Sequence, residues 1–487
     1  MQIPSQQAEG TLRSSLRGVL PVSTRIIFND DHDFHESVRP RNLNYPYRPF
    51  AVIYPEEAEG VSAIVRWASK HGVALQARSG GHDYINKGIG AADGAIVVDM
   101  TAFQQLSVDE AGIATVGPGL QLRVLVQGLH DNGRRCLPHG SCPSVGVGGH
   151  ATVGGLGALG RVHGVMLDAM VQAQVVLASG EIVSASQNAH LDLFWAVRGA
   201  AASFGIVTEF RFQTIPEPQS ILPFSYMTKS GNTYQLETFK AFHSFIQDPH
   251  LHPKLSIRAM IAKSNLMIGG IFMGPEAEFS ALQIQDWIPN LDSHTVGPSK
   301  TWIEYMSEVF DSFGEGGFND QPSYFHSEDV VIPYCKIPSA VDLNALFDHL
   351  STADAGTDRW MALVDVQGGV ANSVPVGATA YPHRDTLYFF STFIQTPSPT
   401  PKAAYEFSRN ATRLLQGGDG GPDKYLSYAG TPVFGIHPRQ YYGEENHARL
   451  QLIKTSVDPL DVFSTPTGIK PLNALNNLRI ELELSAS

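Results

Sequence analysis

The chain has 487 residues, which is long enough for two or three domains with large hydrophobic cores. Hydrophobic residues make up 43% of it and charged residues 17%, a composition that argues against intrinsic disorder. The net charge is −13, from 34 basic and 47 acidic residues, so nucleic acid is not an expected partner. A membrane is not expected either, because no apolar run reaches the roughly 18 residues of a membrane helix.

The N-terminal residues MQIPSQQAEGTLRSSLRGVLPVS lack the apolar segment of a secretion signal. The three cysteines, Cys136, Cys142 and Cys335, provide no disulfide framework. We therefore expect a cytoplasmic protein, with secretion as the alternative if a signal was removed.

Short strands alternate with helices between residues 50 and 133. The predicted strands are 50–55, 73–79, 94–100 and 112–119, and the predicted helices are 56–72 and 120–133. The strand at 73–79 leads into a tight glycine turn from which His82 projects. This alternation indicates an α+β arrangement in which glycine loops follow strands.

A second glycine-rich stretch, HGSCPSVGVGGHATVGGLGAL, covers residues 139–159 and contains seven glycines. Backbone with so few side chains can approach a ligand closely, and its N–H groups can surround the oxygens of a pyrophosphate. The reactive side chain of Cys142 lies near the start of this stretch. By composition alone, a surface loop explains the stretch equally well.

The remaining elements fall into two groups separated by Pro216 and Pro218. Before these prolines we predict a strand pair over 165–186 that turns at Ser179-Gly180, a helix over 192–199 and a strand over 204–215. After them we predict helices at 233–248 and 341–352 and strands at 255–263, 266–274, 360–370 and 386–396. The second group fits a large antiparallel sheet backed by helices.

Four sequence stretches together resemble the berberine-bridge-enzyme-like flavoprotein oxidases, within the vanillyl-alcohol-oxidase superfamily. They are RSGGHDY (78–84), GSCPSVGVGGHATVGGLG (140–157), DLFWAVRGAAASFGIVTEFRF (192–212) and YYGEENHARLQLIKTSVDPLDVF (441–463). The resemblance implies a PCMH-type FAD-binding domain of two α/β subdomains, formed by residues 1–216 and a C-terminal return at 431–487. A substrate-binding domain at 217–430 would lie between them.

The resemblance also implies a bicovalent FAD, because in many members the matching His and Cys are both joined to the isoalloxazine ring. Here they are His82 and Cys142. The other positions expected to line the cofactor are Arg78, Ser79, Gly80, Gly81, Val145, Gly146, Gly149, Gly154, Gly157 and Ile206, the last at the adenine end. No metal site is predicted. A Rossmann GxGxxG fingerprint is missing from the start of the chain, which argues against NAD.

Oxidation of an alcohol needs a base for the hydroxyl proton. In the carbohydrate oxidases of the family a Tyr assisted by an Asp takes this role, and the matching residues are Tyr428, in KYLSYAG, and Asp365, in WMALVDVQGG. Ser427 replaces the Asn that usually precedes this Tyr. Met361 and Leu363 occupy positions where a sugar pocket would offer an aromatic ring and a polar contact, so a more apolar pocket is expected.

Our main prediction is therefore an FAD-linked oxidase of an apolar or aromatic alcohol, with a place in secondary metabolism. Molecular oxygen is the expected acceptor, because the small Val145 lies at the position thought to control oxygen access to the flavin. One alternative is a carbohydrate oxidase that forms lactones, and another is a non-redox cyclase in which the flavin is structural. The tail at 473–487 could add an edge strand, since RIELELS alternates, or be a variable end.

Overall fold

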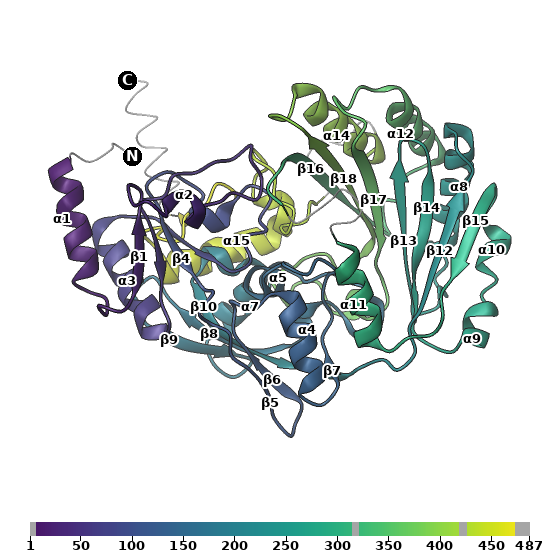
Figure 1. Ribbon diagram of the computed structural model, residues 1–487. Coiled ribbons are helices and arrows are strands. Elements are labelled where there is room, and N and C mark those ends of the chain that lie inside the picture. Colours follow the sequence, from purple (N-terminus) through teal and green to yellow (C-terminus); the bar gives the residue numbers. More distant parts are fainter. Residues whose placement is uncertain (1–5, 314–320, 418–425, 473–487) are drawn as a thin grey trace.

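The computed structural model describes residues 6–313, 321–417 and 426–472. Its ribbon has two lobes: the N-terminal half and the C-terminal segment form one, and the middle of the chain forms the other (Figure 1). The sheets of the first lobe have the strand orders β1-β2-β4-β3 and β5-β6-β10-β8-β9, and the second lobe holds a seven-stranded sheet. The predicted α+β fold with a large antiparallel sheet is confirmed. The domain limits remain predictions.

The four-stranded sheet carries the first glycine turn at the end of one strand. Its strands are β1 (Arg25–Phe28), β2 (Ala51–Tyr54), β4 (Ile96–Asp99) and β3 (Leu75–Arg78). The strands β2, β4 and β3 run parallel, and all four residues of β4 are buried, as expected for a parallel strand covered on both faces. The helix α3 (Ala58–His71) ends at Gly72, whose φ of 65° suits a glycine cap.

The five-stranded sheet is antiparallel and lies beside the second glycine stretch. Its strands are β5 (Leu106–Val108), β6 (Ile113–Val116), β10 (Ile206–Gln213), β8 (Met170–Val176) and β9 (Ile182–Ser186). The prediction of a strand from residue 165 was too long, because Met166–Ala169 form the short 3-10 helix η2. The helices of this region are α4 (Leu122–Asp131), α5 (Val147–Val153), α6 (Gly160–His163) and α7 (Leu191–Ala200).

The second lobe is a sheet with one face covered by helices. Its strand order is β15-β12-β14-β13-β17-β18-β16, with every neighbouring pair antiparallel. The strands are β15 (Leu291–Val296), β12 (Leu222–Thr228), β14 (Leu266–Phe272), β13 (Leu255–Ala262), β17 (Trp360–Val366), β18 (Thr386–Thr396) and β16 (Tyr324–Pro333). The helices α8 (Asn232–Phe245), α12 (Ala340–Thr352) and α14 (Lys402–Leu415) cover one face (Figure 1). Strictly alternating burial along β13 and β17 leaves the opposite face partly accessible.

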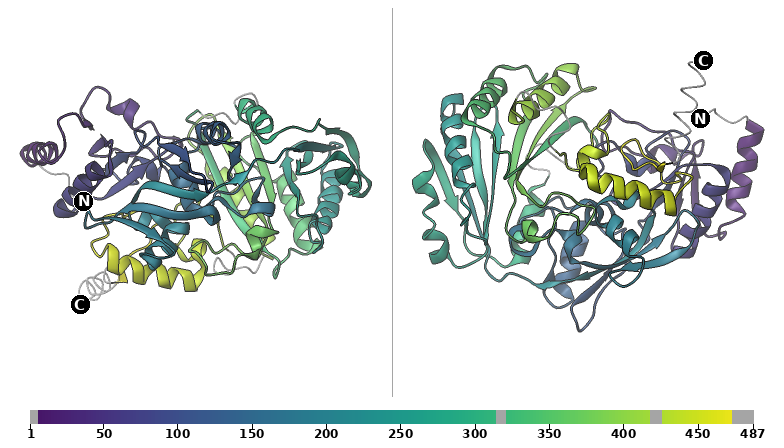
Figure 2. Two further views of the ribbon diagram at one scale, coloured as in Figure 1. Left: turned by 90° about the horizontal axis from the view of Figure 1, so that it is seen from below. Right: turned by 180° about the vertical axis from the view of Figure 1, so that it is seen from behind.

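Two helices from later parts of the chain pack on the first lobe. The helix α11 (Trp302–Ser312) lies between the sheet of the second lobe and α4 (Figure 1), and it buries Trp302, Met306 and Phe310 in the core of the first lobe. The helix α15 (Arg439–Val457) crosses the back of the first lobe (Figure 2). The C-terminal segment therefore packs on the N-terminal half of the chain.

Among the described residues, none of the helices has the length and hydropathy needed to cross a bilayer. The alternating tail at 473–487 lies outside the described residues, so the expected edge strand is not tested.

Candidate active site

The two glycine-rich loops lie against each other, backbone to backbone. A Cβ atom added to Gly80 would lie 2.4 Å from the backbone nitrogen of Gly146, a distance that no side chain tolerates. Gly81 has a φ of 70°, which glycine adopts without strain. The Oγ atom of Ser79 accepts a hydrogen bond of 3.3 Å from the backbone N–H of Gly148. The glycines therefore allow the loop after β3 to reach the loop before α5.

This contact brings the two predicted flavin-linking residues to one hydroxyl group. The Nε2 atom of His82 lies 2.6 Å from the Oγ atom of Ser144, and the Sγ atom of Cys142 lies 3.9 Å from that same oxygen. His82 and Cys142 come from loops that are 60 residues apart in the sequence. Two nucleophilic side chains thus lie around one hydroxyl group, where the planar ring of a flavin could be attached at two of its positions.

The same region has the features of an FAD site. Gly149 has open space around its Cα, because an added Cβ would meet no atom within 4 Å. The side chain of Arg78 is held by Asp99 (Nε–Oδ2 2.7 Å), so only its backbone is left for the cofactor. The donor set of two nucleophiles beside exposed glycine backbone therefore fits a covalently held FAD.

The other predicted cofactor residues have mixed environments. Val145 packs partly buried against the core of the first lobe, and its carbonyl accepts a hydrogen bond of 2.9 Å from the N–H of Leu122. Gly157 is enclosed, since an added Cβ would lie 1.7 Å from the carbonyl oxygen of His139. Ile206 is the first residue of β10, and its side chain is 1% exposed. Only backbone atoms of Ile206 are therefore suited to a ligand contact.

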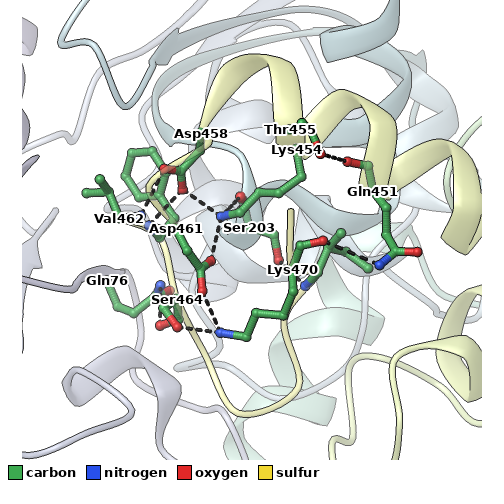
Figure 3. Close-up of polar contacts among 12 residues, drawn as sticks. Gln76, Ser203, Gln451, Lys454, Thr455, Asp458, Asp461, Val462, Ser464 and Lys470 are labelled. Carbon is green, nitrogen blue, oxygen red and sulfur yellow. Dashed lines mark hydrogen bonds and ion pairs between the residues drawn. The ribbon is translucent and has the colours of Figure 1, made fainter. Parts of the chain in front are cut away.

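A buried polar cluster holds the segment just before Ile206 (Figure 3). The ammonium group of Lys454 is fully buried and donates to the carbonyl oxygen of Ser203 at 2.7 Å and to the carboxylate of Asp458 at 2.6 Å. Asp461 lies between Lys454 (3.1 Å) and Lys470 (2.7 Å). The C-terminal segment therefore fixes the part of the first lobe that is predicted to meet the adenine end.

Tyr428 lies beside the second glycine stretch. A Cβ added to Gly154 would lie 3.2 Å from the Tyr428 hydroxyl, so glycine at this position, with a φ of 144°, lets the tyrosine approach the chain. Burial raises the pKa of Tyr428, whereas the backbone N–H of Gly155 lowers it by favouring the phenolate. The tyrosine ring packs against Phe389 and His383 with centroid distances of 5.4 and 6.2 Å.

Asp329, on β16, is a site residue that the sequence reasoning missed. Its carboxylate accepts hydrogen bonds of 2.7 Å from the backbone N–H of Tyr428 and from the hydroxyl of Thr431. Burial raises its pKa to about 7. Its place in the strand YFHSEDVVIP could have drawn attention, because a carboxylate in a buried strand needs specific partners.

The structure gives Asp365 a different neighbour from the one predicted. Its Oδ1 atom forms an ion pair of 3.1 Å with Arg258, whereas the carboxylate that contacts Tyr428 is that of Asp329. Asp365 lies opposite Phe389 in the sheet, and Phe389 packs on Tyr428. Asp365 and Tyr428 therefore have Phe389 as a common neighbour. The side chain of Ser427 contacts β16, because its hydroxyl donates a hydrogen bond of 3.3 Å to the backbone carbonyl of Asp329.

We use the name open face for the side of the seven-stranded sheet opposite to its helices. A row of cross-strand neighbours on this face consists of Met227, Met267, Met260, Leu363 and Ser391. All five are partly accessible. Phe393, on the same face, packs edge-on against Tyr84, two residues after His82, with a centroid distance of 6.2 Å. The open face therefore borders the candidate flavin site and carries both apolar and charged side chains.

Comparisons with known proteins point to an FAD-binding protein. The family profile described as "FAD binding domain" matches residues 49–186, and the profile described as "Berberine and berberine like" matches residues 422–470. The FAD-linked oxidoreductase sorD of Penicillium rubens is 32% identical over 468 residues, which cover 93% of this chain and 96% of that protein.

Two oligosaccharide oxidases are also similar. The chitooligosaccharide oxidase of Gibberella zeae is 30% identical over 88% of this chain and 89% of its own. The structure of glucooligosaccharide oxidase from Acremonium strictum, whose title names a 6-S-cysteinyl, 8α-N1-histidyl FAD, has a TM-score of 0.85 and 27% identity. It covers 95% of this chain and 99% of its own.

Proposed function

Because this chain belongs to the berberine-bridge-enzyme-like family of FAD-linked oxidoreductases, we propose that it oxidises a CH–OH group with an FAD joined to His82 and Cys142. The proposed links are those named for glucooligosaccharide oxidase, from N1 of the histidine, which is Nδ1, to the 8α carbon and from the cysteine sulfur to C6. The convergence of both side chains on Ser144 supports this assignment.

The proposed chemistry assigns the substrate proton to Tyr428. When bound, the flavin supplies the hydride acceptor. As its phenolate, Tyr428 takes the hydroxyl proton while hydride leaves the carbon that bears the hydroxyl group. Burial raises the pKa of Tyr428, and the Gly155 N–H offsets part of this rise by stabilising the phenolate. Asp329 holds the backbone of Tyr428 in place. Asp365, whose charge is paired with Arg258, is proposed to assist Tyr428 from the open face.

We propose a carbohydrate as the substrate class, oxidised at its reducing end to a lactone. The observation that carries this choice is the similarity, at 27–30% identity over most of both chains, to oxidases of chito- and glucooligosaccharides. This reverses the order of the predictions from sequence, which gave first place to an apolar alcohol. A non-redox role for the flavin is not proposed, because the sorD protein and the two oligosaccharide oxidases are named as oxidoreductases or oxidases.

An apolar or aromatic alcohol is the second candidate, favoured by the open face. Met260 and Leu363 are direct cross-strand neighbours there, and Phe389, the cross-strand neighbour of Asp365, packs on Tyr428. Such side chains offer apolar contact but few hydrogen bonds to sugar hydroxyls. The 32% identical relative from Penicillium rubens carries no substrate in its name, so it is compatible with either candidate.

Dioxygen is the proposed electron acceptor, supported by the small Val145 beside the Cys142 turn and by the oxidase names of two relatives.

To test the substrate class, the enzyme should be mixed with reducing oligosaccharides and, separately, with aromatic alcohols under anaerobic conditions. Loss of the oxidised flavin absorbance with oligosaccharides, followed by peroxide release in air, is the expected result. Bleaching by aromatic alcohols alone would favour the second candidate, and no bleaching by either class would contradict both.

A matched variant makes the comparison sharper. Leu363→Gln introduces a hydrogen-bonding side chain on the open face. If the substrate is an oligosaccharide, this variant should raise kcat/KM by about tenfold, the effect of one hydrogen bond to substrate. If the substrate is an apolar alcohol, the variant should lower kcat/KM by about the same factor. Met227→Gln, farther along the same row, serves as the control and should change neither value.

A further inference from the structure

We propose that Ser144 is a positioning residue for covalent flavin attachment, acting on His82 and Cys142 through one hydroxyl group. The inference rests on the proposed function, because it presupposes that these two residues carry FAD. It follows from the distances of 2.6 Å to His82 Nε2 and 3.9 Å to Cys142 Sγ. Both lie within hydrogen-bonding range for the atoms concerned.

The backbone presents Ser144 between the two nucleophiles. The N–H of Val145 donates to the carbonyl of Cys142 at 3.4 Å, which closes a turn with Pro143 and Ser144 at its centre. Proline fixes the backbone at the first central position of such a turn. The contact between Gly80 and Gly146 then sets the distance from this turn to the loop of His82. Ser144 is thus placed by features of both loops.

The direction of the hydrogen bond between His82 and Ser144 bears on which nitrogen of His82 is the nucleophile. A neutral imidazole carries one N–H and one lone pair, on different nitrogens. When Nε2 carries the hydrogen and donates it to Ser144 Oγ, the lone pair is on Nδ1. Nδ1 is the nitrogen of the proposed link to the 8α carbon. A Ser144 hydroxyl that accepts from Nε2 therefore holds His82 in the tautomer that can attack.

The same hydroxyl can act on Cys142. While its oxygen accepts from His82, its O–H can donate to the cysteine sulfur at 3.9 Å. A hydrogen bond donated to sulfur stabilises the thiolate, which is the nucleophilic form of cysteine. The Ser144 side chain can thus favour the reactive tautomer of His82 and the thiolate of Cys142.

Atoms and electrons balance in the formation of both covalent links when dioxygen is the oxidant. Forming the histidyl link replaces one C–H bond at the 8α carbon and one N–H bond of the imidazole by a C–N bond. Forming the cysteinyl link replaces one C–H bond at C6 and one S–H bond by a C–S bond. Each link releases two electrons and two protons, which pass to dioxygen and leave as hydrogen peroxide.

The test measures attachment itself. Full-length wild type, Ser144→Ala and Ser144→Thr are produced in flavin-depleted cells and mixed with FAD in air. Acid precipitation at intervals gives the rate of covalent incorporation. The same series in His82→Ala and Cys142→Ala backgrounds separates the two links. Ser179→Ala is the control, because Ser179 is also a turn serine whose Oγ accepts a backbone hydrogen bond (3.2 Å).

We expect Ser144→Ala to slow each link at least about tenfold, the effect of one hydrogen bond of ordinary strength, with unchanged non-covalent FAD affinity. Ser144→Thr should restore the rate to within about threefold. Attachment in Ser144→Ala at the wild-type rate, or no rescue by threonine, would overturn the role of Ser144 alone. Wild type that never binds FAD covalently would contradict the proposed attachment as well.

Discussion

The carboxylate of Asp329 accepts a hydrogen bond of 2.7 Å from the backbone N–H of Tyr428, 99 residues further along the chain. This bond joins β16 of the seven-stranded sheet to the segment that carries the proposed base. Asp329 is 5% exposed, and burial raises its pKa to about 7. A buried carboxyl group with a pKa near neutrality makes both stability and the position of Tyr428 sensitive to pH.

Asp329→Asn should remove a pH-dependent part of the folding free energy. The pKa of Asp329 is raised from 3.8 to about 7 on folding, so the folded protein keeps a proton that the unfolded chain loses in this range. The free energy of unfolding of wild type should therefore fall, relative to Asp329→Asn, as pH rises from about 4 to about 7. The predicted change is on the order of 2–4 kcal/mol. Urea unfolding of both proteins at pH 5 and pH 8 measures it, and a difference independent of pH would contradict the assignment.

Tyr428→Phe should separate catalysis from cofactor binding. Loss of a positioned proton acceptor lowers the rate of flavin reduction by about 10²–10⁴-fold. Covalent flavin content should stay at the wild-type level, because among the described residues the Tyr428 hydroxyl forms no hydrogen bond with His82 or Cys142. Stopped-flow mixing without oxygen gives the reduction rate. Tyr234→Phe, at an exposed tyrosine on α8, is the control, and full activity in Tyr428→Phe would remove Tyr428 from the mechanism.

Two glycine variants should have different defects, one in stability and covalent attachment and the other in FAD binding. Gly80→Ala forces a Cβ to within 2.4 Å of the Gly146 nitrogen, so it should lower the Tm of the flavin-free protein and prevent both covalent links. Gly149→Ala meets no protein atom within 4 Å, so it should leave that Tm unchanged and weaken FAD binding. Calorimetry and FAD titration of flavin-free protein distinguish the two effects. Equal FAD affinity in Gly149→Ala and wild type would show that the space around Gly149 does not hold cofactor.

Lys454→Met should destabilise the first lobe strongly. The substitution leaves the fully buried carboxylate of Asp458 without its cation, a change that typically costs about 3–5 kcal/mol. Chemical unfolding of the flavin-free protein provides the measurement. Lys402→Met is the matched control, because Lys402 is 86% exposed and its pair with Glu406 (2.8 Å) contributes at most about 1 kcal/mol. Similar losses in the two variants would contradict a structural role for the buried cluster.

The accuracy of the sequence predictions depended on how apolar each element is. The predicted strand at 386–396 coincides with β18, because aromatic residues and threonines buried along nearly its whole length form an unmistakable run. The strand β16 was not predicted, because His326, Glu328 and Asp329 interrupt its apolar pattern. The carboxylate of Asp329 is tolerated there through contacts that only the fold creates, its hydrogen bonds of 2.7 Å from the N–H of Tyr428 and the hydroxyl of Thr431.

The candidate site, too, could be predicted only in part. His82 and Cys142 could be chosen from local motifs, whereas their shared contact with Ser144 depends on the packing of two distant loops. The pairing of Asp365 with Arg258 likewise follows from strand register, since these residues are direct neighbours on β17 and β13. Long-range contacts of this kind have no signature in the sequence of either partner.

The bond between Lys454 and the carbonyl of Ser203 also bears on when the cofactor site is completed during synthesis. These residues are 251 positions apart, and the whole second lobe is made between them. At about 5–20 residues per second, a ribosome needs on the order of 13–50 seconds to travel from one to the other. For that time the segment before Ile206 lacks its buried cation. FAD capture should therefore follow translation of α15, and a chain stalled before Lys454 should accumulate without flavin.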